Sequence, residues 1–253
     1  MNAIRRRVVS PAIFIMLVAV SLFYAAGCGG LKLADTLRTS PSDWPTFAGQ
    51  ESRTNATSEQ IQPPLKLAWE YDISGGIGNG SPLVVDSVLL VGNLRGELYA
   101  ISLVTGKRIG WVTLGDAIQG SPAIDHNTAI VAVSNSRESL ISYNLIEGKP
   151  RWKHAYGDIE VSPLLHDQKI YVGNTQGMFH CVDQATGDQL WKFEIPKNTK
   201  RKGIRSSAAT EGESVVFGAE DGAVYTMDAV SGKLLWSYQT GASVVSPPAI
   251  ANG

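Results

Sequence analysis

The fold is decided by the stretch Gly222-Ala223-Val224-Tyr225-Thr226-Met227-Asp228-Ala229-Val230-Ser231-Gly232-Lys233-Leu234-Leu235-Trp236, because the chain repeats it. A close second copy runs from Gly177 to Trp191, and two looser copies run from Gly96 to Trp111 and from Glu138 to Trp152. Each copy has two strand-like halves around a glycine. A repeat of this length is typical of a radial array of β-sheets.

A turn signal lies in the middle of every copy. The turn glycine is present as Gly106, Gly148, Gly187 and Gly232, and a short polar residue precedes it by four positions as Ser102, Asn144, Asp183 and Asp228. Glycine adopts a positive φ without a steric cost, and short polar side chains accept hydrogen bonds from N–H groups of a turn. The pattern predicts a capped hairpin loop between two strands.

The strand after each turn carries a tryptophan. Three copies place it four residues after the glycine, as Trp152, Trp191 and Trp236. Trp69, in the stretch 65–73, occupies a matching position one repeat earlier. Tryptophan buries a large area and fits well between stacked sheets. We expect these residues to pack one sheet against the next; the alternative is that they are ordinary core tryptophans.

The first copy departs from this spacing. Gly110 stands four residues after Gly106, and Trp111 comes one residue later. Because side chains of a strand alternate between faces, a slip of one residue would aim Trp111 at the wrong face. We expect a β-bulge near Gly110 that restores the orientation of Trp111.

Ser-Pro pairs mark the start of each unit. They begin at Ser81, Ser121, Ser162 and Ser246, and Ser206-Ser207 takes their place once. Two short apolar runs follow each pair and precede the glycine-centred motif, so each unit holds four strands. The longer spacing before Ser206 contains a basic insertion at 197–203, either a solvated loop or a contact for an acidic partner or lipid head groups.

These units predict an all-β fold, a β-propeller of four-stranded blades at 79–115, 119–157, 160–195 and 204–241. A fifth unit begins at 244–250, just before the end of the sequence at Gly253. The stretch 65–73 reads as the last strand of another blade whose first three strands are missing. We therefore expect an incomplete ring of about four blades, with eight in the full protein.

The N-terminus resembles a bacterial lipoprotein signal. Arg5, Arg6 and Arg7 precede an apolar stretch of about 15 residues, which is shorter than the ~20 residues that span a bilayer. Small residues then lead to Cys28. The resemblance implies cleavage before Cys28 and acylation of this residue; a plain secretory signal or an uncleaved anchor is the alternative. We expect a signal peptide at 1–27, a polar tether at 28–42 and the partial propeller at 43–253.

The motif Asp-x-x-Ser/Thr-Gly-x-x-x-Trp, together with the Ser-Pro strands and the lipoprotein signal, resembles the PQQ-like β-propeller superfamily. Within it, the overall plan is similar to that of the BamB-type lipoproteins of outer-membrane assembly. The stretch 43–55 also resembles the opening of many such propellers, and we expect Trp44 and Phe47 to pack on the first blades. The resemblance implies a non-enzymatic scaffold, anchored by lipid in the outer membrane, that faces the periplasm and binds the barrel-assembly complex, without a cofactor.

Two other functions stay open. Pyrroloquinoline-quinone (PQQ) dehydrogenases share the tryptophan motif and bind PQQ and calcium; they tend to carry two adjacent cysteines, whereas Cys181 stands alone within a strand pattern. The four histidines, His126, His154, His166 and His180, lack the spacing of a metal site. The third possibility is a propeller that binds a carbohydrate or a signalling partner. A net charge of −1 argues against a nucleic-acid partner.

Overall fold

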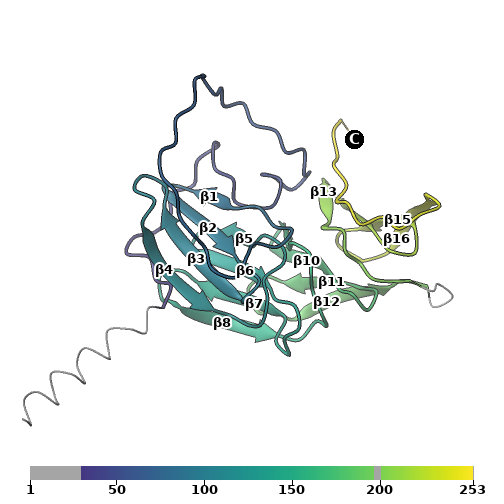
Figure 1. Cartoon of the computed structure of the whole chain (residues 1–253). Helices are drawn as coiled ribbons and strands as arrows, with labels where there is room; N and C mark the ends of the chain where they lie inside the picture. The colour runs from purple at the N-terminus through teal and green to yellow at the C-terminus, as the bar shows by residue number, and fades with distance from the viewer. Residues whose placement is uncertain (1–29, 197–200, 253) are drawn as a thin grey trace, which may run out of the picture.

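The computed structural model describes residues 30–196 and 201–252. Their strands form four antiparallel sheets, each with its strands in chain order (Figure 1). Blade 1 consists of β1 (Leu83–Val85), β2 (Val88–Gly92), β3 (Glu97–Ser102) and β4 (Arg108–Thr113). Blade 2 consists of β5 (Ala123–Asp125), β6 (Thr128–Ala132), β7 (Leu140–Asn144) and β8 (Lys149–His154).

The other two blades have the same plan. Blade 3 consists of β9 (Leu164–His166), β10 (Lys169–Gly173), β11 (Met178–Asp183) and β12 (Gln189–Glu194). Blade 4 consists of β13 (Ala209–Glu211), β14 (Ser214–Gly218), β15 (Ala223–Asp228) and β16 (Leu234–Gln239). The predicted all-β partial propeller and its four blades are therefore confirmed. In the described part of the chain, no helix has the length and apolar character needed to span a bilayer.

The predicted hairpin loop joins the third and fourth strands of each blade. In blade 3, Asp183 Oδ1 accepts hydrogen bonds from the N–H groups of Ala185 and Thr186 at 3.0 and 2.8 Å. Gly187 has a φ of 81° and donates its N–H to the carbonyl of Asp183. Asp228 and Gly232 of blade 4 repeat this arrangement, and the side chains of Ser102 and Asn144 accept from their turns in the same way.

The tryptophans of β8 and β12, Trp152 and Trp191, pack onto the hairpin turn of the next blade, and we call them docking tryptophans. Trp152 of blade 2 donates its indole N–H to the carbonyl of Gln184, and its ring covers Gly187 in blade 3 so closely that a Cβ there would lie 2.7 Å from it. Trp191 of blade 3 does the same to Ala229 and Gly232 in blade 4. Glycine is thus required at this position for two reasons: the turn needs a positive φ, and a Cβ would collide with the face of the indole.

Trp69 and Trp236 are the first and the last tryptophans at this repeat position in the sequence. Trp69 donates to the carbonyl of Leu103 at 2.7 Å and covers Gly106, as its predicted position requires, although residues 65–73 are extended without forming a strand of a sheet. Trp236 has the same register in blade 4, opposite Thr226, and is 51% exposed.

Trp111 does not take the role that we predicted. A bulge is present at Ile109, but blades 2, 3 and 4 have a bulge at the same place, so it corrects nothing. Gly110 stands opposite Ala100, in the register position of the docking tryptophan, and Trp111 pairs with Tyr99. The prediction for Trp111 is therefore wrong. Its ring stacks on Tyr99 at 6.2 Å and packs with Trp69 on the opposite face of blade 1.

The N-terminal segment fills the place that Gly110 leaves empty. A Cβ at Gly110 would lie 3.1 Å from Leu31 Cα, and one at Gly148, the turn glycine of blade 2, would lie 3.1 Å from Lys32 Cβ. The backbone N–H of Leu33 donates to the carbonyl of Leu145 at 2.7 Å. Leu145 corresponds to the residues whose carbonyls accept the indole N–H in the other blades. The N-terminal segment therefore supplies the N–H group and the cover over the turn that a tryptophan side chain supplies in the other blades.

The prediction that residues 28–42 form a polar tether is consequently wrong for residues 31–37. Leu31, Leu33 and Leu37 are buried in the core that blades 1 and 2 share. The hydroxyl of Tyr143 donates to the carbonyl of Leu31 at 2.8 Å, and the N–H of Leu37 donates to Asn127 at 2.8 Å. We call residues 30–38 the clamp.

A second segment, residues 43–55, crosses the inner strands of the propeller. Trp44 forms a β-bridge with Val84 of β1 and packs on the core of blades 1 and 2, which confirms the expected packing of Trp44. Carbonyls further along accept hydrogen bonds from the N–H groups of Ile124 in β5 and Thr210 in β13. The segment thereby supplies partners to strand edges that would otherwise stay unpaired.

Arg53 fixes this crossing segment. Its buried guanidinium donates to the hydroxyl of Thr46 and to the carbonyls of Phe47, Pro163 and Ala208. Burial lowers the pKa of Arg53 to about 10, so this side chain is charged at neutral pH. A buried cation with this many acceptors holds its neighbours in one geometry.

We predict that Gly187→Ala destabilises the protein much more than Gly212→Ala. Both glycines have positive φ, 81° and 72°, but nothing lies within 4 Å of a Cβ at Gly212. Each variant should lose about 1 kcal/mol of unfolding free energy from backbone strain. Gly187→Ala should lose roughly 1–3 kcal/mol more, because its methyl group displaces the Trp152 ring. Urea denaturation measures both, and equal losses would contradict the docking role.

Candidate functional site

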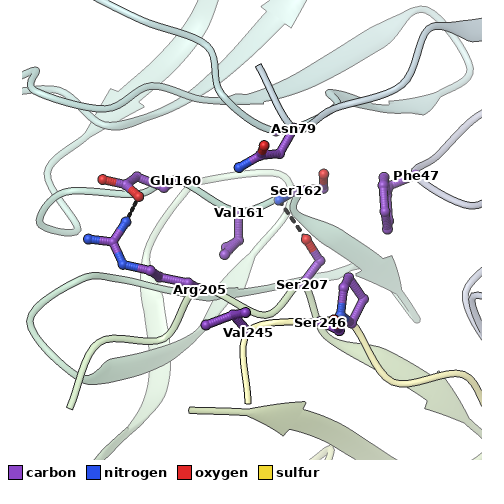
Figure 2. A pocket seen from close by; sticks show the side chains of 11 residues that line it. Phe47, Asn79, Glu160, Val161, Ser162, Arg205, Ser207, Val245 and Ser246 are labelled. Carbon is purple, nitrogen blue, oxygen red and sulfur yellow. Dashed lines mark hydrogen bonds and ion pairs between the residues drawn. The ribbon is translucent and has the colours of Figure 1, made fainter. Parts of the chain in front are cut away.

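A pocket of about 430 Å³ lies at the inner ends of the blades (Figure 2). It is enclosed by the segments that enter the inner strands and by Phe47 of the crossing segment. Its lining comprises Phe47, Asn79, Gly120, Glu160, Val161, Ser162, Arg205, Ser207, Val245, Ser246 and Pro247. The residues come from all four blades' inner edges and from the fifth unit, so only a propeller arrangement brings them together.

A ladder of serines links the blades beside this pocket. The N–H of Ser81 donates to the hydroxyl of Ser121 at 2.7 Å, Ser121 donates likewise to Ser162 at 2.8 Å, and Ser162 to Ser207 at 3.0 Å. The last of these bonds is drawn in Figure 2. Ser121, Ser162 and Ser207 therefore share one role, since each accepts on its hydroxyl from the serine of the previous blade.

The ladder corrects one alignment. Ser207, rather than Ser206, stands in the Ser-Pro position of blade 4, two residues before β13. Ser206 instead donates its hydroxyl to the carbonyl of Ser246 at 3.0 Å and accepts from the N–H of Gly218. Of the basic insertion at 197–203, residues 197–200 lie outside the described residues.

Arg205 is the charged group of the pocket. Its guanidinium pairs with the carboxylates of Glu160 and of Glu220, which come from blades 3 and 4, and Figure 2 shows the first of these contacts. Both carboxylates are thus engaged by one cation. The serines are engaged by the ladder, and the pocket lining contains no histidine or cysteine that could act as base or nucleophile.

The four histidines lie apart from the pocket and have different surroundings. His126 is exposed beside Asp125, and His154 packs on the Trp152 ring. His166 lies with Nδ1 2.6 Å from Glu51 of the crossing segment. Among the residues that the structure describes, no group of three His, Cys, Asp or Glu side chains is arranged to hold a metal ion.

His180 is the buried member of this set. It lies on β11 at the interface of blades 2 and 3, with Nδ1 3.0 Å from Gln189 and its ring 5.0 Å from that of Tyr156. Burial lowers the pKa of His180 below 6.5. The neutral ring is therefore the form that the folded protein favours.

Cys181 follows on the same strand and faces the core of blades 3 and 4. It is fully buried and packs as a small apolar side chain. Burial raises the pKa of its thiol to about 12. Cys28, the predicted acylation site, lies outside the described residues.

The motifs described from the sequence did not include one set of turn residues. Asn93 of blade 1 and Asn174 of blade 3 cap the loop between the second and third strands, each accepting two backbone N–H groups on Oδ1. Asn174 also donates to the carbonyl of Tyr156 in blade 2 at 2.8 Å. The repeated letters Val-Gly-Asn-x-x-Gly at 91–96 and 172–177 could have revealed them.

The sequence profile of the family "Outer membrane protein assembly factor BamB" matches residues 65–193 and 176–253. The chain belongs to this family. A curated relative with the same description, from Burkholderia pseudomallei, is 27% identical over 246 aligned residues that cover 84% of this chain and 62% of the relative. The quinohemoprotein alcohol dehydrogenase ADH IIB of Pseudomonas putida is 34% identical over 88 residues, 32% of this chain and 13% of the enzyme.

Solved structures show the same fold. BamB from Moraxella catarrhalis aligns over 72% of this chain and 58% of its own, with a TM-score of 0.57 and 20% identity. The quinohemoprotein alcohol dehydrogenase from Comamonas testosteroni aligns over 81% of this chain and 43% of its own, with a TM-score of 0.68 and 18% identity. The chain thus spans less than two thirds of the length of these relatives, and its PQQ-like propeller is similar both to that of BamB and to that of quinohemoprotein alcohol dehydrogenases.

We predict that Cys181 does not react with thiol reagents in the folded protein. Its burial and a pKa of about 12 leave almost no accessible thiolate at pH 8. Titration with a chromogenic disulfide should count no Cys181 thiol before denaturation and one afterwards. Fast labelling of Cys181 in the native protein would show that β11 opens readily.

We also predict that His180 makes the folded protein acid-sensitive. Because its pKa is lower when folded than when unfolded, the unfolded chain binds more protons below pH 6.5. Stability should therefore fall as the pH drops through 6.5, and the loss should level off below the folded pKa. Denaturation curves of His180→Gln should show a weaker pH dependence in this window than those of the parent, and an unchanged dependence would contradict the role of His180.

Proposed function

We propose that this protein is a non-enzymatic scaffold of the bacterial cell envelope, anchored by acylated Cys28 in the outer membrane, that binds the barrel-assembly machinery from the periplasmic side. One observation carries the proposal: the family match runs through the propeller from residue 65 to residue 253. The similarity to the BamB of Burkholderia pseudomallei likewise extends over most of the chain, whereas ADH IIB matches a third of it.

The pocket supports a binding role. Its charged residues Arg205 and Glu160 pair with each other, Arg205 also pairs with Glu220 beside the pocket, and the serine ladder uses polar groups next to the inner strands for contacts between blades. A scaffold needs rigid blades that hold exposed loops in fixed positions, and both features increase rigidity. No cofactor is part of this proposal.

A PQQ- and calcium-dependent dehydrogenase is the second candidate. It is favoured by the local identity to ADH IIB, which exceeds that to the BamB relative. The residues described here offer no carboxylate group of three arranged as a calcium site, so the chemistry would depend on residues beyond them. A carbohydrate-binding or signalling propeller is the third candidate.

The test combines binding with catalysis. We expect the purified acylated protein to bind the periplasmic domains of the cognate barrel insertase in a surface-immobilised assay, and an envelope lipoprotein of another fold should not bind. Mass spectrometry of the N-terminal peptide should find acyl chains on Cys28 that are absent from Cys28→Ser. Mixed with PQQ and calcium, the protein should not reduce an artificial electron-accepting dye with alcohols or sugars.

Two results would contradict the proposal. Dye reduction that depends on PQQ would favour the dehydrogenase. Absence of insertase binding, together with binding to an oligosaccharide array or to another envelope protein, would favour the third candidate.

A further inference from the structure

The clamp determines where the chain leaves the propeller. Residues 30–33 are held between Gly110 at the end of blade 1 and Gly148 in blade 2, and Figure 1 shows the chain reaching the rim beside β4 and β8. Leu31 is fully buried only three residues after Cys28. An extended chain of three residues spans about 10 Å. An anchor on Cys28 would therefore hold this part of the rim against the bilayer.

The rim at this exit is basic. The outer strands β4 and β8, with the residue before β4, carry five exposed cations: Lys107, Arg108, Lys149, Arg151 and Lys153. In β8, Pro150, Trp152 and His154 alternate with them, and Trp152 and His154 pack on Gly187 of blade 3. The cations are left to face solvent. We call these five residues the basic rim.

The outer strands of blades 3 and 4 are less basic, although Lys233 stands directly before β16. Among the outer strands described, β12 carries one lysine and one glutamate, and β16 carries no charged residue. Two acidic residues near the basic rim, Glu147 and Glu138, pair with Lys149 and Lys153 at 2.9 and 3.5 Å. Lys107, Arg108 and Arg151 make no ion pair within the described chain, which leaves a net charge of about +3 on the rim.

We propose that the basic rim is a docking surface for the head groups of anionic phospholipids, so that the propeller stands with blades 1 and 2 against the membrane. The inference rests on the proposed acylation of Cys28, which brings this surface to the bilayer. Each basic side chain near an anionic bilayer shifts the ratio of docked to undocked protein about fivefold. The three unpaired cations together shift it about a hundredfold.

The experiment measures which part of the rim approaches the lipid. The full-length acylated protein is reconstituted in vesicles that contain an acceptor dye on a lipid head group. A donor dye is placed on Thr113→Cys at the end of β4 or, as control, on Ser237→Cys in β16; both native positions are exposed. Cys181 is buried and remains unlabelled.

We expect energy transfer from Thr113→Cys to exceed that from Ser237→Cys in vesicles of phosphatidylcholine mixed with phosphatidylglycerol. The difference should shrink to the part that the anchor alone produces in pure phosphatidylcholine, at about 1 M salt, where charges are screened beyond ~3 Å, and in the variant Lys107→Gln/Arg108→Gln/Arg151→Gln. The matched variant Lys192→Gln/Lys233→Gln, which removes exposed lysines of blades 3 and 4, should retain it. Circular dichroism verifies that each variant is folded.

Equal transfer from the two positions in anionic vesicles would overturn the proposal, and so would a difference that is as large in pure phosphatidylcholine as in anionic vesicles. The proposal would also be overturned if the basic rim did not bind anionic lipid but bound an acidic protein. Binding by the basic rim is measured without the anchor in a Cys28→Ser background. There the triple variant should bind anionic vesicles about a hundredfold more weakly than its parent, and equal binding would refute the rim even if acylation is absent.

Discussion

Contact between successive blades depends on the fit of an indole onto a glycine turn. The indole supplies apolar area and one N–H, and the turn supplies a flat surface without a Cβ and a free carbonyl. A buried hydrogen bond of this kind contributes about 1 kcal/mol, and leaving its carbonyl unpaired would cost more. A blade that carries this tryptophan also presents a glycine turn, so the contact can recur from one blade to the next; blade 1, with Gly110 in the tryptophan position, is the exception.

The junction of blades 1 and 2 shows what this contact requires. Gly110 removes the indole, yet the carbonyl of Leu145 still receives an N–H, and the turn at Gly148 is still covered. The clamp meets both needs with backbone and with Leu31 and Leu33. The requirement is therefore for an apolar cover and one donor, and tryptophan is one way to meet it.

Local features of the fold could be predicted from the sequence. The turn at Asp183 and Gly187 depends on residues within one repeat, and the docking of Trp152 and Trp191 joins neighbouring repeats through residues that recur in the sequence at the same spacing. The clamp could not be predicted in this way. Leu31 and Leu37 form hydrogen bonds with residues 112 and 90 positions away, and nothing local distinguishes them from leucines of a tether.

The candidate site was harder still. Arg53 contacts carbonyls of residues 163 and 208, and Arg205 draws its partners from two blades. Such pairs follow from the packing of neighbouring blades around shared inner edges rather than from any spacing in the chain. The choice of Ser206 over Ser207 failed for a related reason: the insertion before blade 4 shifts the count, and only the hydrogen bonds of the ladder identify the equivalent residue.

The two N-terminal segments give the molecule a mechanical property that its repeats alone would not. Residues 30–38 fasten the rim between two blades, and residues 43–55 bind the inner strands of blades 1, 2 and 4. Only four residues separate these segments, so the rim and the inner edges are connected through the same short stretch. If Cys28 carries the anchor, a partner bound by the loops is held at a distance from the membrane that the blades themselves set. A flexible tether would leave that distance undefined. The clamp would therefore let a scaffold hold its partner at a fixed position.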